Sequence, residues 1–159
     1  MDDISKGLLF CEMLIGSNAV TTWSIIRQNP SENPEKEAVI KVVIDAYING
    51  FFNVGDVSLV KKGFHPDSDV YILSKGTLMK VPVYSYIERM GENFRPLHEG
   101  TTYEFTHVHV TGSAGMAVVE IFQEDRHIYT DYIAIYKFAE GWKIVIKIYY
   151  QYPRNDSGL

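Results

Sequence analysis

The sequence contains a single cysteine, Cys11, among its 159 residues. One thiol cannot form an intrachain disulfide, and it cannot build a zinc site of four thiolates. We therefore expect a domain that is stabilised by an ordinary hydrophobic core, in a reducing compartment such as the cytoplasm. No cofactor is predicted.

Clustered basic residues and long apolar runs are also scarce. The formal net charge is −5, and a nucleic-acid surface would need clustered Lys and Arg. The apolar stretch from Leu8 to Ile15 is interrupted by Glu12 and follows Asp2 and Asp3, whereas a secretory signal begins with basic residues. It is far shorter than the roughly 20 residues that span a bilayer. We expect neither a nucleic-acid nor a membrane partner.

Motifs for covalent and metal chemistry are missing. The sequence has no Gly-rich phosphate loop, no Gly-x-Ser-x-Gly elbow and no cysteine with an evident base. His107 and His109 would point the same way from one strand, as some metal ligands do, but no Glu follows His109 within four residues. We therefore predict no metal site.

The composition that is present indicates a globular protein. Hydrophobic residues make up 46% and charged residues 22% of the chain, and this length suits one hydrophobic core. A polar, Pro-containing run at 29–34 separates the first residues from the rest. We predict a tail with a weak helix at 1–33, a single domain at 34–152 and a C-terminal tail at 153–159.

The strongest local pattern predicts a long helix over 35–53. Asn33 can cap it with Pro34 at its first position, and Gly55 can end it. Polar residues recur every four positions in a narrow stripe: Glu37, Lys41, Asp45, Asn49 and Asn53. Because nearly everything else in this segment is apolar, we expect other elements to cover most of the helix. Asp56 can cap a short second helix.

The remainder of the chain predicts strands and one further short helix. Turn residues and β-rich runs divide it into short strands at 69–73 and 77–81, a helix at 82–90, and long strands at 102–111, 114–124, 128–138 and 142–152. The predicted fold class is α+β, with a curved antiparallel sheet wrapped around the long helix.

Counting residues from the predicted hairpin turns assigns side chains to the two faces of this sheet. The apolar face is expected to pack on the helix and line any cavity; it carries Val108, Val110, Ala117, Val119, Ile121, Thr130, Tyr132, Ala134, Tyr136, Trp142, Ile144, Ile146 and Ile148. The opposite face is expected to point outward and to suit a homodimer surface; it carries Phe105, His107, His109, Met116, Glu120, Phe122, Tyr129, Asp131, Ile133, Val145, Lys147 and Tyr149.

The order of these elements resembles the nuclear transport factor 2-like (NTF2-like) superfamily of cone-shaped, cystatin-like folds. The resemblance covers about 34–152. Within the superfamily, five stretches resemble the putative lumazine-binding, or SnoaL-like, group: Tyr47-Ile48-Asn49-Gly50, Gly55-Asp56, Phe64-His65-Pro66-Asp67, Tyr129-Thr130-Asp131-Tyr132 and Gly141-Trp142-Lys143-Ile144-Val145. The resemblance implies a cavity inside the cone and frequent dimerisation through the sheet. It implies no single activity, because the superfamily includes isomerases, cyclases, dehydratases and non-catalytic binding modules.

Six residues are candidates for binding a ligand in such a cavity. Aromatic walls with a few polar tips are typical of small-molecule pockets, and the candidates are Tyr47, His65, Tyr86, Thr130, Tyr132 and Trp142. Packing in the core is the alternative for each aromatic residue. For His65, the alternative is a local contact that satisfies the His-Pro-Asp turn.

His65 and Asp131 are the candidate catalytic residues. Burial of Asp131 between tyrosines could raise the pKa of its carboxyl and make it a general acid or base. The predicted register instead places Asp131 on the outward face with Glu120 and Lys147, where an ion-pair cluster is the simpler interpretation. The interpretation reverses if that face is concave.

Two hypotheses of function follow. The first is a protein that binds a small, mostly apolar or aromatic molecule, with cofactor-free isomerisation or dehydration as the chemistry that such a cavity suits. The second is a non-catalytic homodimeric module that uses the outer face of the sheet.

Overall fold

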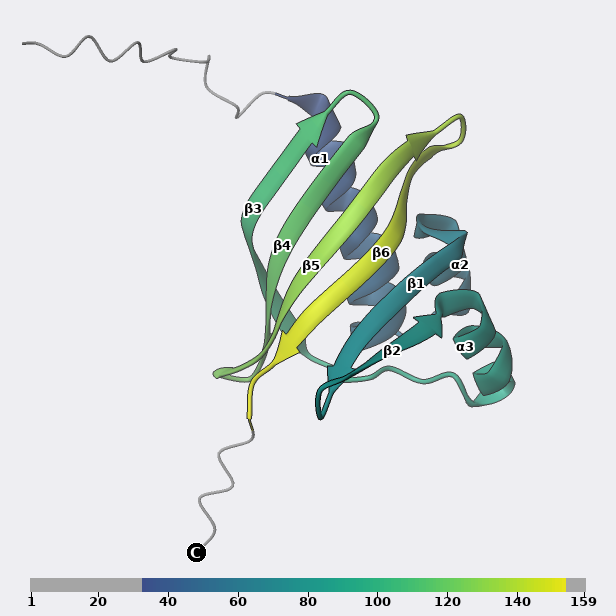
Figure 1. Cartoon of the computed structure of the whole chain (residues 1–159), viewed down its shortest axis with the longest axis vertical. Coiled ribbons are helices and arrows are strands. Elements are labelled where there is room, and N and C mark those ends of the chain that lie inside the picture. Colours follow the sequence, from purple (N-terminus) through teal and green to yellow (C-terminus); the bar gives the residue numbers. More distant parts are fainter. Residues whose placement is uncertain (1–32, 154–159) are drawn as a thin grey trace, which may run out of the picture. The chain divides into compact units, whose positions relative to one another are not determined.

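The computed structural model describes residues 33–153. The predicted helix within 1–33, with Cys11, and the tail beyond 153 therefore lie outside the described residues. The helices are α1 (Pro34–Val42), η2 (Val43–Asn53), α2 (Val57–Gly63), α3 (Val83–Met90) and η3 (Gly91–Asn93). The strands are β1 (Phe64–Ser74), β2 (Thr77–Pro82), β3 (Thr101–Thr111), β4 (Ala114–Gln123), β5 (Arg126–Phe138) and β6 (Gly141–Gln151) (Figure 1).

The predicted long helix is confirmed, and its second half is a π-helix. Asn33 caps it by accepting a hydrogen bond from the Glu35 backbone N–H at 3.0 Å. α1 continues directly into η2, which is wound as a π-helix. A π-helix has more than four residues per turn, so residues four positions apart lie close to one face. Tyr47 and Phe51 consequently face the same space and line one cavity.

The short helix α2 is held closely against η2. Asp56 caps it, as predicted, by accepting from the Ser58 backbone N–H at 2.7 Å. A Cβ atom on Gly50 would lie 2.8 Å from a methyl group of Val60, and one on Gly63 would collide with Ala46. Glycine at these two positions allows the close approach that fixes the chain entering β1.

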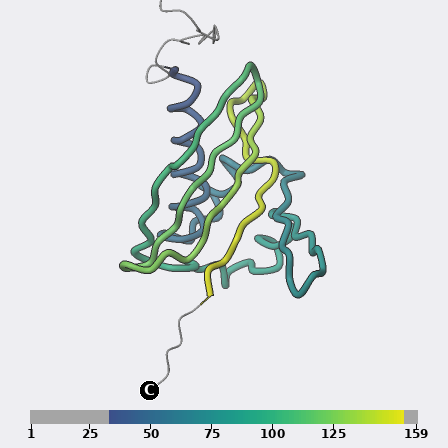
Figure 2. Tube along the Cα trace, turned by 60° about the vertical axis from the view of Figure 1, so that its left-hand side comes forward, coloured from purple at the N-terminus to yellow at the C-terminus, as the bar shows by residue number. Residues whose placement is uncertain are grey.

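The six strands form one sheet in the order β2-β1-β6-β5-β4-β3. All neighbours are antiparallel except β1 and β6, which are parallel. The prediction of a wholly antiparallel sheet missed this pair, which arises because the chain crosses from β2 to the opposite edge of the sheet before β3. The strands curve past the central helix, which lies along one face (Figure 1, Figure 2). The predicted α+β class and curved sheet around a long helix are confirmed.

The register within the sheet departs from the prediction in β5. The predicted Gly112-Ser113 turn is confirmed, but Gln123 pairs with Arg126, so the next turn lies one residue earlier than predicted. Phe122 then pairs with His127 and Ile121 with Tyr129, which leaves Ile128 as an unpaired bulge residue. One extra residue exchanges the faces of everything after it.

The turn before β6, where Phe138 pairs with Gly141, restores the predicted facing of the first residues of β6, and a second bulge then exchanges the faces again. Ile135 pairs with Ile144 and Ala134 with Ile146, so Val145 is the extra residue. The two bulges define an inner face, toward the helix, and an outer face. After the bulges, the inner face of β5 and β6 carries Tyr129, Asp131, Ile133, Ile135, Lys147 and Tyr149. The outer face carries Thr130, Tyr132, Ala134, Tyr136, Ile146 and Ile148.

The predicted orientation of β5 and of β6 beyond Val145 is therefore wrong, whereas that of β4 is correct. Ala117, Val119 and Ile121 are fully buried on the inner face. Trp142 and Ile144 precede the Val145 bulge and also point inward, as predicted. The core lies between this face and the central helix.

Candidate functional site

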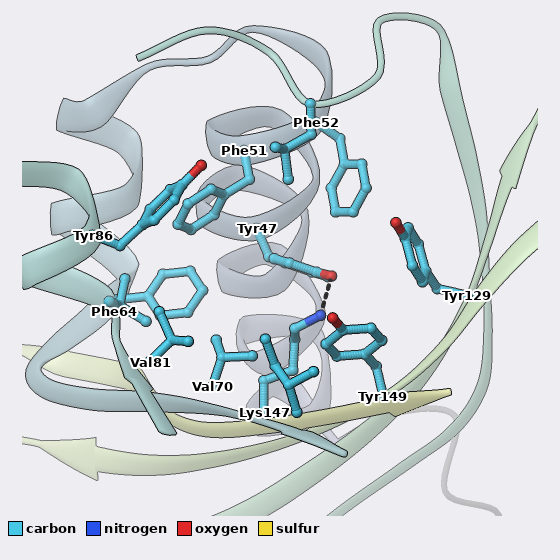
Figure 3. Close-up of a pocket in the computed structure, with 13 residues that line it drawn as sticks. Tyr47, Phe51, Phe52, Phe64, Val70, Val81, Tyr86, Tyr129, Lys147 and Tyr149 are labelled. Atoms are coloured by element: carbon cyan, nitrogen blue, oxygen red, sulfur yellow. Dashed lines mark hydrogen bonds between the residues drawn. The ribbon is translucent and has the colours of Figure 1, made fainter. Parts of the chain in front are cut away.

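A cavity of about 260 Å³ lies between η2 and the inner face of the sheet, beside β1, β2 and α3 (Figure 3). Its lining is dominated by aromatic and aliphatic side chains. The residues are Tyr47, Phe51, Phe52, Phe64, Val70, Ile72, Val81, Val83, Tyr86, Leu97, Tyr129, Lys147 and Tyr149. Leu97 is 47% exposed, so the lining reaches the protein surface.

Packed aromatic rings make one wall of the cavity. The ring of Phe51 meets that of Phe64 edge-on at 5.5 Å between centroids, and that of Phe94 at 5.6 Å. Tyr47 and Phe52 make a similar contact at 5.2 Å. Such edge-to-face contacts between rings are favourable and stabilise the packing of this wall.

At the opposite end of the cavity, three polar side chains from three different elements contact one another, and two of them line the cavity. Lys147 on β6 donates to the Tyr47 hydroxyl and to the Asp131 carboxylate, both at 2.7 Å. The Tyr47 hydroxyl, on η2, donates to the other oxygen of Asp131 at 2.8 Å. Asp131 is 0% exposed and Lys147 8% exposed. We call Tyr47, Asp131 and Lys147 the buried triad.

The surroundings of Lys147 determine its charge. Desolvation lowers the pKa of its ammonium group, and the Asp131 carboxylate opposes that effect by stabilising the cation. The ammonium also lies 4.1 Å from the centre of the Tyr149 ring and 4.8 Å from that of Tyr47. The paired carboxylate and the two ring faces favour the charged form at neutral pH.

The hydroxyls near Lys147 remain protonated at neutral pH. Burial raises the pKa of Tyr47 well above its ordinary value, and the negative charge of Asp131 adds to the rise. Burial likewise raises the pKa of Tyr149, with smaller contributions from Tyr129 and Asp131. The polar end of the cavity therefore presents neutral phenols around one ion pair.

Two of the six predicted ligand-binding residues line this cavity. Tyr47 belongs to the buried triad, and Tyr86 on α3 stands in the wall beside Phe51 (Figure 3). Their role in binding a ligand stays a prediction. Trp142 points inward as expected, but its indole N–H donates to Glu35 at 2.7 Å, and it is not part of the cavity lining.

His65 makes local contacts instead of facing the cavity. Its Nδ1 accepts a hydrogen bond from the Asp67 backbone N–H at 3.1 Å. Its ring stacks on Phe138 at 4.7 Å between centroids. These contacts match the alternative interpretation of His65 as part of a satisfied turn.

Thr130 and Tyr132 lie on the outer face because of the bulge at Ile128, so their predicted placement beside the cavity is wrong. Tyr132 is 43% exposed. Thr130 donates to Glu120 at 2.5 Å, and the Glu120 carboxylate lies 2.6 Å from a ring nitrogen of His127. This outer-face pair is separate from the buried triad.

Asp131 is placed by the same shift on the inner face, where the prediction had it outward. The predicted ion pair with Lys147 is present, at 2.7 Å, but it is buried against the helix and does not include Glu120. Asp131 is not among the cavity-lining residues. It contacts the cavity only through its partners Tyr47 and Lys147.

The lining residues that the sequence analysis missed are mainly Lys147, Tyr129 and Tyr149. The turn-based count did place these three with Asp131 on one face, which is correct. The count assigned that face outward because the opposite face of the sheet carries more apolar residues. That face carries many aromatic rings together with an Asp and a Lys that can pair. This combination was the signal in the sequence that the face could point inward.

Among residues 33–153, no group of three His, Cys, Asp or Glu side chains is arranged to hold a metal ion. Nor does any helix in the described part of the chain have the length and apolarity that crossing a membrane requires.

Comparison with known proteins identifies the family. A family model described as "Putative lumazine-binding" matches residues 35–150. An NTF2-like protein of unknown function from Shewanella baltica is 18% identical and covers 79% of this chain and 99% of its own, with a TM-score of 0.63. A second, from Silicibacter pomeroyi, is 18% identical over 73% of this chain and 94% of its own, with a TM-score of 0.59. At these identities the likeness shows the fold alone. No curated protein matches the sequence.

Proposed function

Because the chain belongs to the putative lumazine-binding family of NTF2-like folds, whose description points to small ligands, we propose that it binds a small, mostly apolar or aromatic molecule. The site is the cavity between η2 and the inner face of the sheet. One observation carries the proposal: an aromatic-walled cavity of about 260 Å³ ends at a buried triad whose members are hydrogen-bonded to one another.

The composition of this cavity fits a ligand site better than a packing defect. Ligand pockets combine apolar walls with a few fixed polar groups, and here Lys147 and Tyr47 supply those groups. A buried ion pair contributes little net stability compared with apolar residues of the same size. The presence of a buried ion pair beside a cavity therefore favours a role of that pair in binding a ligand.

Filling the cavity tests this proposal. Val81 lines the cavity from β2, and Leu78 on the same strand is 66% exposed. Val81→Trp should abolish binding of a naphthalene-type probe followed by NMR titration, while the matched control Leu78→Trp should leave it unchanged. Equal binding by both variants would overturn the proposal.

Cofactor-free isomerisation or dehydration is the catalytic form of this proposal. Lys147 is the group that could exchange a proton with a bound molecule, since it lines the cavity and Asp131 lies next to it as a proton acceptor. The Lys147 ammonium would pass a proton to the Asp131 carboxylate, and the neutral amine would then take the proton from the ligand carbon, while His65 would have no part in the chemistry. We expect the protein to catalyse deuterium uptake at the carbon beside the carbonyl of an enolisable aryl ketone. Unchanged deuterium uptake in the double variant Asp131→Asn/Lys147→Met would exclude this assignment.

A homodimer through the outer face is a second proposal, favoured by exposed apolar side chains there. Tyr132 pairs with Ile148, which is 50% exposed, and Ala134 pairs with Ile146. Ile148→Glu should convert a dimer to a monomer in light scattering, whereas Leu73→Glu, at a 73% exposed position on β1, should not. A monomeric wild type would remove this proposal.

A cytoplasmic location completes the proposed function. It rests on the single cysteine, which suits a reducing compartment. Fractionation of the source cells with an antibody to the protein would test it.

A further inference from the structure

We infer that the molecule bound in this cavity is uncharged and carries a hydrogen-bond acceptor, such as a carbonyl oxygen, that is held by Lys147. This inference rests on the proposed ligand-binding function and narrows it to a chemical class. It follows from the charges and the hydrogen-bond donors at the polar end of the cavity.

The charge at that end is already balanced. Among residues 33–153, Lys147 is the only lining residue with a charged side chain, and its ammonium is paired with the fully buried Asp131 at 2.7 Å. A bound carboxylate would bring a second negative charge next to Asp131, and one of the two would lack a full partner. Burying an unpaired charge is strongly unfavourable. A bound cation would be repelled by the ammonium at close range.

The donors at that end are not all used. An ammonium has three N–H groups, and Lys147 directs one to Tyr47 and one to Asp131. Its other contacts are with ring faces, those of Tyr149 at 4.1 Å and Tyr47 at 4.8 Å. A neutral acceptor would make a stronger, charge-assisted hydrogen bond there than a ring face does.

Tyr149 supplies a second donor for the same acceptor. Its side chain lies beside the Lys147 ammonium at the polar end of the cavity (Figure 3). No hydrogen bond of the Tyr149 hydroxyl to another residue within 33–153 is found, and burial keeps the hydroxyl protonated. One carbonyl oxygen has two lone pairs and can accept from both groups.

The rest of the cavity determines the body of the ligand. Its other walls are the rings of Phe51 and Phe64 and the aliphatic side chains of Val70 and Val81. Its volume of about 260 Å³ is slightly below the roughly 300–1,000 Å³ usual for ligand pockets. A flat body of one or two rings suits this space.

Three probes of nearly identical shape test the inference. They are 2-acetylnaphthalene, which is a neutral ketone, 2-naphthoate, which is an anion, and 2-isopropylnaphthalene, which has no acceptor. NMR titration of the full chain should give a dissociation constant for the ketone about tenfold lower than for the hydrocarbon. The carboxylate should bind more weakly than the ketone. A carboxylate that binds tightest, or a ketone that binds no better than the hydrocarbon, would overturn the inference.

Asp131→Asn tests the charge argument separately. In this variant the Lys147 cation has lost its counterion, so the probe carboxylate can take its place, and at pH 6 the preference should reverse toward 2-naphthoate. Glu120→Gln is the matched control, because it removes a carboxylate from the outer face of the neighbouring strand. An unchanged preference in Asp131→Asn would contradict the charge balance.

The hydrocarbon separates this inference from the function on which it rests. If 2-isopropylnaphthalene binds in the cavity but the three affinities do not differ as expected, the cavity is a ligand site and the inferred class is wrong. If none of the three probes binds, the proposed function itself fails, and the inference fails with it.

Discussion

The two faces of β4, β5 and β6 carry similar polar pairs in opposite settings. On the inner face, Asp131 pairs with Lys147 at 2.7 Å and neither is appreciably exposed. On the outer face, Glu120 pairs with His127 at 2.6 Å, and their side chains are 18% and 30% exposed. Residue type alone does not distinguish the pairs. The side of the sheet decides whether a carboxylate is partly exposed or is buried next to the cavity-lining residues.

Removing each carboxylate should give the largest difference between the two faces. Asp131→Ala leaves the buried Lys147 cation without a partner and should lower the free energy of unfolding by about 3–5 kcal/mol. Glu120→Ala leaves a partly hydrated His127 and should cost about 1 kcal/mol. Urea denaturation measures both.

The contrast can be sharpened by removing both members of the inner pair. Asp131→Asn/Lys147→Met leaves no buried charge and should be less destabilised than Asp131→Ala. Equal losses for Asp131→Ala and Glu120→Ala would mean that the inner pair is hydrated in solution.

Removing either of two hydroxyls in the inner site should lower the free energy of unfolding by less than Asp131→Ala does. The Tyr47 hydroxyl donates to Asp131 and accepts from Lys147, so Tyr47→Phe should cost about 1–3 kcal/mol of unfolding free energy. Tyr149 lines the cavity and its hydroxyl makes no hydrogen bond within residues 33–153, so Tyr149→Phe should cost less than about 0.5 kcal/mol. Thermal unfolding of the two variants makes the comparison, and a larger loss for Tyr149→Phe would contradict the assigned roles.

The smallest expected effect is a change in stability at alkaline pH. The pKa of Tyr47 is raised above its ordinary 10.0, so its contribution to stability is complete below pH 10 and is lost as the pH rises through the folded-state pKa. The lowered pKa of Lys147 acts in the opposite sense, adding stability as the pH rises toward 10.5. The wild type should therefore lose stability more steeply than Tyr47→Phe above about pH 10. Parallel curves from urea titrations at pH 9 to 11 would exclude the raised pKa.

Much of the fold could be predicted from the sequence because its signals are local. The Asn33-Pro34 start and the polar stripe with a period of four predicted the central helix, which was found from Pro34 to Asn53. Gly112-Ser113 predicted the turn between β3 and β4. Each of these signals depends on residues that are close to one another in the sequence.

The candidate site could be predicted only in part because it depends on register. Tyr47 and Tyr86 sit on helices, where periodicity sets the face, and both line the cavity. Tyr132 and Lys147 lie beyond a bulge at Ile128. No glycine or turn residue at that position indicates a bulge in the sequence. Both faces of β5 carry aromatic and apolar residues, so the hydrophobic pattern could not reveal the one-residue shift.

Binding of a small neutral aromatic molecule beside the buried triad, on the inner face of the sheet, is the main proposal for this protein. Its most direct test is the set of intermolecular nuclear Overhauser contacts between 2-acetylnaphthalene and the full chain. We expect contacts to Lys147, Tyr149 and Phe51, and none to Tyr132 or Ile148. Contacts confined to Tyr132 and Ile148 would place binding on the outer face and contradict the account.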